Sequence, residues 1–149
     1  MGVEAFFQAS VDVFSSGSVM FVFLGVLLGL CFGIIPGLGG TTALALLIPI
    51  TFTMDALDAM YLAGGVMGAT SFGGSITAIL LNTPGTAPNA ATSFDGYPLA
   101  QQGKAGLAIG ASATASAVGG LLGLITLMMF IPLAKEIVLL FGPVEFLLL

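Results

Sequence analysis

The sequence predicts an all-α integral membrane protein with four to five transmembrane or half-membrane helices, including re-entrant segments broken at Pro-Gly pairs. The first reason is composition: 58% of the 149 residues are hydrophobic and only 6% are charged, whereas soluble domains carry roughly 25% charged residues. The mean hydropathy of +1.18 agrees with this. The second reason is charge spacing, because residues 13–54, 59–94 and 105–134 contain no charged side chain. Each run exceeds the ~20 residues that cross a bilayer core.

Residues 1–54 are expected to hold an interfacial helix, a span and a half-helix. Over residues 1–16, large apolar side chains recur every three or four positions, at Val3, Phe6, Phe7, Val11 and Phe14. This spacing is typical of an amphipathic helix that lies on the membrane surface. Residues 18–54 predict a span over 18–35, followed by a half-helix over 41–53, which is apolar but short and contains a proline.

Glycines recur at strict four-residue intervals through the span over residues 18–35. They are Gly25, Gly29, Gly33 and Gly37. Four-residue spacing puts small residues on one face of a helix, and such a face lets a neighbouring backbone approach closely. The span is therefore expected to pack against another helix along this face.

Residues 55–98 predict a second span followed by a re-entrant loop. Asp55 and Asp58 fit an N-cap and an acid in the first helical turn. The run over 59–81 is rich in Gly, Ser and Thr, which serves either helix packing or a functional site. The sequence Asp95-Gly96-Tyr97-Pro98 predicts a turn outside the membrane.

Residues 105–134 predict a third span, and residues 137–149 predict the start of the next one. The first half of the third span is built from small residues and its second half from bulky ones. We expect one half to pack against protein and the other to face lipid. The apolar segment at 137–149 carries no polar tail, so we expect residues 1–149 to be a single membrane domain belonging to a longer chain.

Two Pro-Gly pairs, Pro36-Gly37 and Pro84-Gly85, interrupt the apolar runs. The sequences that follow, PGLGGTTALA and PGTAPNAATS, lie 48 residues apart and resemble each other, which hints at an internal repeat. Broken backbone at membrane depth is tolerated only where protein or a watery cavity satisfies its polar groups. A helix that restarts after such a break presents free N–H groups and a partial positive charge, which suit an anion. We therefore expect the two breaks to meet inside the bundle and form a substrate site, as in secondary transporters.

The predicted substrate-binding residues surround these breaks, where glycines supply backbone geometry and Thr and Asn supply neutral donors. They are Gly37, Gly39, Gly40, Thr41, Thr42, Asn82, Thr83, Pro84, Gly85, Asn89 and Thr92. Thr86 lies in the same stretch. Asn82, Thr83 and the N–H groups after Pro84 are expected to face Thr41 and Thr42. The candidates for coupling to Na⁺ or H⁺ are Ser71, Ser75 and Asp95.

Several function classes are excluded by composition. The chain has no His to activate a serine, and isolated acids do not form an aspartyl dyad, so we predict no enzyme activity, no cofactor and no metal site. The net charge is −5 and the two lysines, Lys104 and Lys135, are isolated, which argues against nucleic-acid binding. Cys31 is the single cysteine, so an internal disulfide is impossible.

Three stretches, GIIPGLGGTTALALLIPIT (33–51), GATSFGGSITAILLNTPGTAPNAATSFDGYPLAQQGKAG (68–106) and FGPVEFLLL (141–149), resemble the large (TctA-type) membrane subunit of bacterial tripartite tricarboxylate transporters. From Gly25 onward the chain is similar to the amino-terminal part of that subunit. The resemblance implies a multi-pass protein of the bacterial cytoplasmic (inner) membrane that imports citrate-like carboxylates by ion symport. It also implies two partners, a periplasmic solute-binding protein and a small second membrane subunit.

The resemblance further implies that the chain is one half of a repeat-built transporter. Family members continue beyond Leu149 into a second half with its own Pro-Gly-rich break, so residues 1–149 alone are not expected to transport. Two alternatives stay open at this point. One is a structural or channel-like membrane module with no carboxylate site, and the other is a re-entrant transporter for a neutral or cationic solute.

Overall fold

The computed structural model describes residues 8, 11, 13, 14 and 17–139. In this part of the chain the elements are α2 (Val19–Ile34), α3 (Gly40–Thr51), α4 (Ala56–Leu81), the 3₁₀-helix η1 (Ala87–Asn89), α5 (Ala90–Gln101) and α6 (Ala105–Leu139), with no strand. The predicted all-helical class is confirmed. The predicted surface helix over 1–16 and the segment over 137–149 lie mostly outside the described residues.

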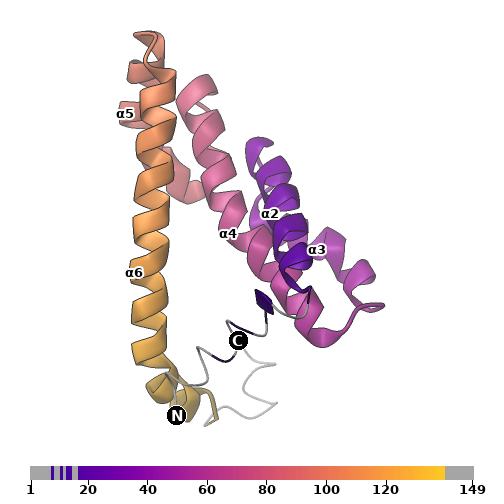
Figure 1. The fold of residues 1–149 in the computed structure, drawn as a ribbon. Helices are drawn as coiled ribbons and strands as arrows, with labels where there is room; N and C mark the ends of the chain where they lie inside the picture. Colours follow the sequence, from indigo (N-terminus) through magenta and orange to yellow (C-terminus); the bar gives the residue numbers. More distant parts are fainter. Residues whose placement is uncertain (1–7, 9–10, 12, 15–16, 140–149) are drawn as a thin grey trace.

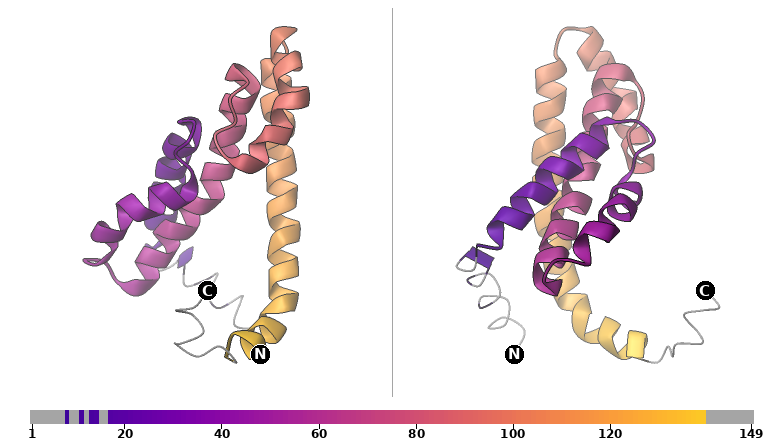
Figure 2. Two further views of the ribbon diagram at one scale, coloured as in Figure 1. Left: turned by 180° about the vertical axis from the view of Figure 1, so that it is seen from behind. Right: turned by 90° about the vertical axis from the view of Figure 1, so that its right-hand side faces the viewer.

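Helix α4 is the central element, and the other helices pack along it (Figure 1 and Figure 2). Its 26 residues make it about 39 Å long at the rise of an α-helix, enough to cross the ~30 Å hydrocarbon core with some tilt. It begins after Asp55, whose side chain makes no cap hydrogen bond, and Asp58 lies in its first turn. Ser18, before α2, donates a hydrogen bond to the Asp58 carboxylate at 3.1 Å.

Helix α2 runs parallel to α4 along the predicted glycine face. A Cβ added to Gly29 would meet the carbonyl oxygen of Val66, and one added to Gly33 would lie 2.5 Å from the carbonyl oxygen of Thr70. Gly25 meets α4 in the same way one turn earlier. The backbones are thus too close for any side chain, as the four-residue spacing predicts.

Gly37, the fourth glycine of the series, does not belong to this packing face. Helix α2 ends at Ile34, and Gly37 lies in the break with φ +87° and nothing within 4 Å of an added Cβ. The prediction was wrong at this position because Pro36, which has no N–H and a fixed φ, follows the end of the helix. Gly37 therefore serves the turn and not helix contact.

Helices α3 and α5 are both 12 residues long, or about 18 Å, which is roughly half of a bilayer core. Near the start of α3, Gly40 lies against Met67 and Thr70 of α4, and Leu47 and Thr51 near its end line one cavity with Ala59 and Met60. Helix α3 is therefore antiparallel to α4. Its buried Ala43 and Leu47 pack with Val66 in the core.

Helix α5 instead runs parallel to α4. Asn89, just before α5, is hydrogen-bonded to Ser71 of α4, and Gly96 lies against Ile79 two turns further along α4. The segment between α4 and η1 therefore runs back along α4, and the chain then reverses direction again in η1 and α5. This return agrees with a re-entrant loop.

The sequence Asp95-Gly96-Tyr97-Pro98 lies inside α5, so the predicted turn at these residues is wrong. Gly96 is buried where an added Cβ would lie 2.7 Å from Cγ1 of Ile79, so tertiary packing overrides the local turn preference. Pro98 lies in the last turn of this short helix and removes one donor near its end. The actual turn follows at Gln102 to Lys104, where Gly103 has φ +76°.

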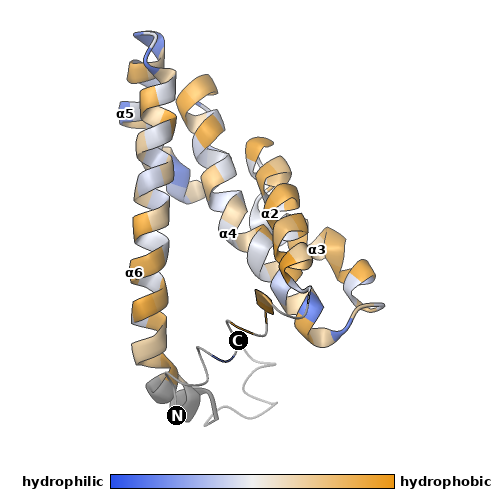
Figure 3. Cartoon of the chain, in the orientation of Figure 1, coloured by the Kyte–Doolittle hydropathy of each residue, from blue (hydrophilic) through white to orange (hydrophobic). Residues whose placement is uncertain are grey.

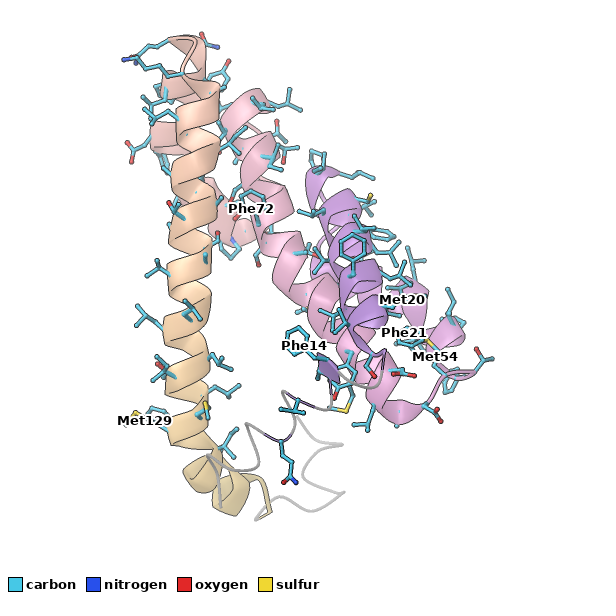
Figure 4. All side chains as sticks on the ribbon, in the orientation of Figure 1. Phe14, Met20, Phe21, Met54, Phe72 and Met129 are labelled. Carbon is cyan, nitrogen blue, oxygen red and sulfur yellow. The ribbon has the colours of Figure 1, made fainter. Side chains whose placement is uncertain are left out.

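Helix α6 descends from that turn along one side of the bundle (Figure 1). Residues Ala105–Ile131 and the whole of α4 are long and apolar enough to cross a membrane. Most of α6 after Ala113 is exposed, and Met129, 76% exposed, points away from the other helices in Figure 4. Polar residues gather at the α5–α6 turn and at the α3–α4 turn, which lie at opposite ends of the bundle (Figure 3). This is the pattern of a protein that spans a bilayer.

Candidate functional site

The first break separates α2 from α3 and leaves the start of α3 uncapped. Gly39 precedes the helix with no side-chain cap. Ala43 donates its amide to the Gly39 carbonyl, but the amides of Gly40, Thr41 and Thr42 have no acceptor among the described residues. The first turn of α3 therefore presents free donors, as helix N-termini do.

The second break begins where α4 ends. Asn82 adopts the left-handed conformation with φ 54°, and the amides of Asn82 and Thr83 both reach the carbonyl of Thr77. A residue in the left-handed conformation commonly ends a helix in this way. Pro84 then prevents the helix from continuing.

Gly85 holds the second break against α2 and α4. Its amide donates to the Gly74 carbonyl at 3.3 Å. A Cβ added to Gly85 would meet the carbonyl oxygen of Gly33 and would lie 2.6 Å from Cα of Gly74. The second break is thus wedged between the end of α2 and the middle of α4.

The two breaks line a shared cavity of about 390 Å³, here named the break cavity. This size falls in the range of small-molecule sites, roughly 300–1,000 Å³. Its walls come from the first break and the start of α3, from the middle of α4, and from the second break and η1. The lining residues are Gly37, Gly39, Gly40, Thr41, Met67, Thr70, Ser71, Gly85, Thr86, Ala87 and Pro88.

Two helix N-termini open into the break cavity. Helix α3 leaves it in one direction, whereas η1 and α5, which form one helical run over residues 87–101, leave it in the other. Each N-terminus carries a partial positive charge of about half an elementary charge. No Asp or Glu belongs to the cavity lining, so the local field favours an anion.

Thr86 adds an unpaired polar atom to this cavity. Its Oγ1 is buried and has no hydrogen-bond partner among the described residues, and the Ala87 amide beside it also lacks an acceptor. A buried hydroxyl without a partner costs about 1–3 kcal/mol. The cavity thus holds donors that a bound oxyanion would satisfy.

A second cavity of about 570 Å³ lies between α4, α5 and α6, and is here named the Asp95 cavity. More than half of its lining residues carry an oxygen or amide in the side chain. The lining residues are Ser71, Ser75, Asn89, Ala91, Thr92, Asp95, Gly96, Leu99, Ala108, Ala111, Ser112, Ala115 and Ser116. Ser71 lines both cavities, so one turn of α4 separates them.

The Asn89 side chain holds η1 against α4 at this dividing wall. Its Nδ2 donates to the Ser71 carbonyl at 2.9 Å, and its Oδ1 accepts from Oγ of Ser75 at 3.3 Å. Asn89 and Ser75 are each only 5% exposed. These two hydrogen bonds, made by buried side chains, hold the start of α5 against the middle of α4.

The predicted site residues fall into three groups. Gly37, Gly39, Gly40, Thr41 and Gly85 line the break cavity. Asn89 and Thr92 line the Asp95 cavity together with all three predicted ion-coupling residues, Ser71, Ser75 and Asp95. Thr42, Asn82, Thr83 and Pro84 belong to the lining of neither cavity.

Several lining residues of the two cavities were not predicted from the sequence. Met67 and Thr70 of α4 complete the break cavity, and Ser112 and Ser116 of α6 complete the Asp95 cavity. The four-residue spacing of the two serines places them on one helical face, which was a usable signal. Nothing in the local sequence indicated that this face meets α5.

Comparisons with known proteins agree with these features. The family profile described as "Tripartite tricarboxylate transporter TctA family" matches residues 19–149. An uncharacterized 52.8 kDa protein in the TAR-I ttuC' 3'region of Agrobacterium vitis is 37% identical over 129 residues, which make up 87% of this chain and 26% of that protein. The chain thus spans about a quarter of that relative's length. No solved structure matches the chain. Because the profile covers nearly the whole sequence, the chain belongs to the tripartite tricarboxylate transporter TctA family.

Proposed function

We propose that the protein is the membrane-embedded subunit of a secondary active, binding-protein-dependent importer of citrate-like tricarboxylates or related carboxylates. An ion gradient across the bacterial cytoplasmic membrane drives the import. One carboxylate of the substrate binds in the break cavity, between the start of α3 and the start of η1. The periplasmic solute-binding protein and the small second membrane subunit are the partners, in keeping with the tripartite description of the family.

The observation that carries the proposal is the meeting of two uncapped helix N-termini in one cavity without an acid. A carboxylate that leaves water must exchange its hydration for fixed donors. The unsatisfied amides of Gly40, Thr41 and Ala87 supply such donors, and the partial charges of both helices add to them. This field repels a cation, and a neutral solute would form weaker hydrogen bonds with these donors than a carboxylate would.

Thr86 provides the sharpest test. In the full-length protein, purified with its partner subunits, Thr86→Val removes the unpaired hydroxyl but keeps a similar volume. We expect citrate affinity to fall by about ten-fold, the equivalent of one lost hydrogen bond to a charged group. Isothermal titration or a citrate-dependent shift of the unfolding temperature would measure this.

Ser93→Ala is the matched control. Ser93 also carries a buried hydroxyl without a partner among the described residues, but it does not line the break cavity. Citrate affinity should be unchanged in this variant. Equal losses in the two variants, or no loss in Thr86→Val, would contradict the assignment of the break cavity. A stable wild-type protein that binds no carboxylate would favour the structural or channel-like module.

Asn82 and Thr83 remain predicted hydrogen-bond donors to the substrate. The same citrate-binding assay can test whether they contact the substrate although they do not line the break cavity. Asn82 has φ 54°, so Asn82→Gly keeps the backbone conformation and removes only the amide side chain. Weaker citrate binding in this variant would place Asn82 in the substrate site. Unchanged binding would leave it the role of ending α4.

A further inference from the structure

An apolar cavity lies between α3 and α4, next to the turn that joins them, and is here named the α3–α4 cavity. Its volume is about 300 Å³. The lining comes from α3 and from the first two turns of α4, and consists of Leu44, Leu47, Ile48, Thr51, Ala59, Met60, Leu62 and Ala63. None of these residues lines the break cavity or the Asp95 cavity.

The lining of the α3–α4 cavity offers a ligand apolar contact without a free hydroxyl. Thr51 carries the one hydroxyl of the lining, and this group already donates to the Ile48 carbonyl at 2.8 Å. Ile48 and Met60 are 51% and 69% exposed, so the cavity opens to the surroundings of the bundle. A polar solute would lose its contacts with water there without replacement, whereas an aliphatic chain would fill the space with van der Waals contacts.

The α3–α4 cavity lies just inside one polar end of the bundle, because the α3–α4 turn forms that end (Figure 3). Ala59 donates its amide to the Asp55 carbonyl at 3.0 Å, and Ala63 follows one helical turn later. The α4 part of the lining therefore reaches about 12 Å from Asp55 along the helix. Each headgroup layer of a bilayer is roughly 5–8 Å thick. A phospholipid whose headgroup lies at the turn would thus place the start of an acyl chain in the cavity.

Two carboxylates lie at the mouth of the α3–α4 cavity. Asp58 accepts a hydrogen bond from Ser18 at 3.1 Å. Asp55 is exposed and makes no hydrogen bond or ion pair through its side chain among the described residues. Residues 1–103 contain no Lys or Arg, so the helices from α2 to α5 offer these acids no basic partner. The mouth of the cavity is therefore complementary to a cationic group.

The start of α4 adds donors for an anion in the same place. The amides of Ala56 and Leu57 have no acceptor in the described part of the chain, and no side chain caps this end of the helix. Because a helix N-terminus also carries a partial positive charge, these amides suit a phosphate group. The turn thus offers a site for a cation beside a site for a phosphate, which are the two charges of a zwitterionic headgroup.

We infer that the α3–α4 cavity binds an acyl chain of phosphatidylethanolamine, whose ammonium group pairs with Asp55 and whose phosphate accepts from the first-turn amides of α4. An ammonium group has three N–H donors for carboxylates, whereas the quaternary ammonium of phosphatidylcholine has none. Phosphatidylglycerol brings a phosphate without any cation, so it would leave the two acids unpaired. The headgroup of phosphatidylethanolamine matches both charges of the turn.

This lipid site is separate from the proposed carboxylate site and does not rest on it. The α3–α4 cavity lies along the second half of α3, whereas the break cavity lies at the start of the same helix. A bound acyl chain fills the space between this part of α3 and the first turns of α4. The lipid thereby holds the half-helix in place from the membrane surface.

The test measures phospholipid binding to the full-length protein, purified with its partner subunits in detergent and stripped of lipid. Native mass spectrometry counts bound lipid against added phosphatidylethanolamine, phosphatidylcholine or phosphatidylglycerol, all with two oleoyl chains, so that only the headgroup differs. We expect phosphatidylethanolamine to bind in a saturable manner. Its apparent Kd should be about three- to five-fold lower than that of either other lipid, as an exposed ion pair allows.

Two variants with matched controls locate the bound lipid. Asp55→Asn should remove the preference for phosphatidylethanolamine and leave phosphatidylcholine binding unchanged. Asp95→Asn also removes an exposed acid, but from α5, and should keep the preference. Ala63→Leu fills the cavity and should remove one bound phosphatidylethanolamine per protein. Ala45→Leu makes the same change at an exposed position of α3 outside the lining, and should keep the wild-type count.

The inference is overturned if phosphatidylethanolamine binds no more tightly than phosphatidylcholine, if Asp55→Asn weakens all three lipids equally, or if Ala63→Leu keeps the wild-type lipid count. A stable wild-type protein that binds no lipid would also overturn it, because a further segment of the protein or a second copy would then fill the cavity. Asp55 is exposed, so Asp55→Asn keeps the test decisive even if Ala63→Leu does not fold.

Discussion

Gly85 and Gly37 both follow a proline in a helix break, but the backbone requires glycine at the two positions for different reasons. Gly37 has φ +87° with free space around it, so a side chain there would strain the chain itself. Gly85 touches the backbone of α2 and α4, so a side chain there would push two elements apart. Gly39 has an ordinary φ of −74°, and the nearest atom lies 4.0 Å from an added Cβ. Neither backbone conformation nor space therefore requires glycine at this position. The sequence predicted a geometric role for all three, but only the fold distinguishes them.

Alanine at these three glycines should therefore give a graded series in the full-length protein. Gly85→Ala should cost about 2–3 kcal/mol of stability by overpacking against backbone that cannot move away. Gly37→Ala should cost about 1–2 kcal/mol because of its left-handed conformation. Gly39→Ala should be close to neutral. Unfolding in detergent, followed by circular dichroism, would measure the series, and a Gly39→Ala variant as damaged as Gly85→Ala would contradict it.

At the scale of single elements, what could be predicted depended on local pattern. The glycine spacing of residues 25–33 predicted the packing face of α2, and Pro36 and Pro84 predicted the two breaks. The directions in which α3 and α5 leave the break cavity were not predictable, because they depend on contacts with α4 such as Gly40 against Met67 and Gly96 against Ile79. Those contacts also override the turn preference of Asp95-Gly96-Tyr97-Pro98. Local sequence therefore located the ends of the elements better than their orientation.

The α2–α4 contact predicts opposite effects of alanine on the two kinds of glycine in these helices. Gly29→Ala should destabilise the full-length protein by about 1–3 kcal/mol, because the new methyl group meets the backbone of Val66. Gly68→Ala in α4 is the control, since nothing lies within 4 Å of its added Cβ. It should stabilise the helix by up to about 1 kcal/mol. Unfolding midpoints of both variants would be compared, and equal destabilisation would mean that the helices do not pack at Gly29.

At the scale of the whole molecule, α2, α3, α5 and α6 all pack along α4. The break cavity lies near Met67 to Ser71, well inside the length of α4. The polar α3–α4 and α5–α6 turns lie at opposite ends of the bundle (Figure 3). The break cavity and the Asp95 cavity are thus both lined by residues from the middle of α4, between the two polar ends. Such a placement fits a transporter that binds its solute near the bilayer midplane.

This arrangement predicts that the α3–α4 turn and the α5–α6 turn face opposite sides of the membrane. Cys31→Ser gives a background without thiols, since Cys31 is the single cysteine. In that background, Thr53→Cys and Gln102→Cys each place one thiol in an exposed turn. An impermeant maleimide added to intact spheroplasts should label one of the two variants and should label the other only after the membrane is opened. We expect labelling from opposite sides because α4, which is about 39 Å long, separates the two turns. Labelling of both variants from the same side would mean that α4 does not cross the membrane, and neither cavity could then lie at membrane depth.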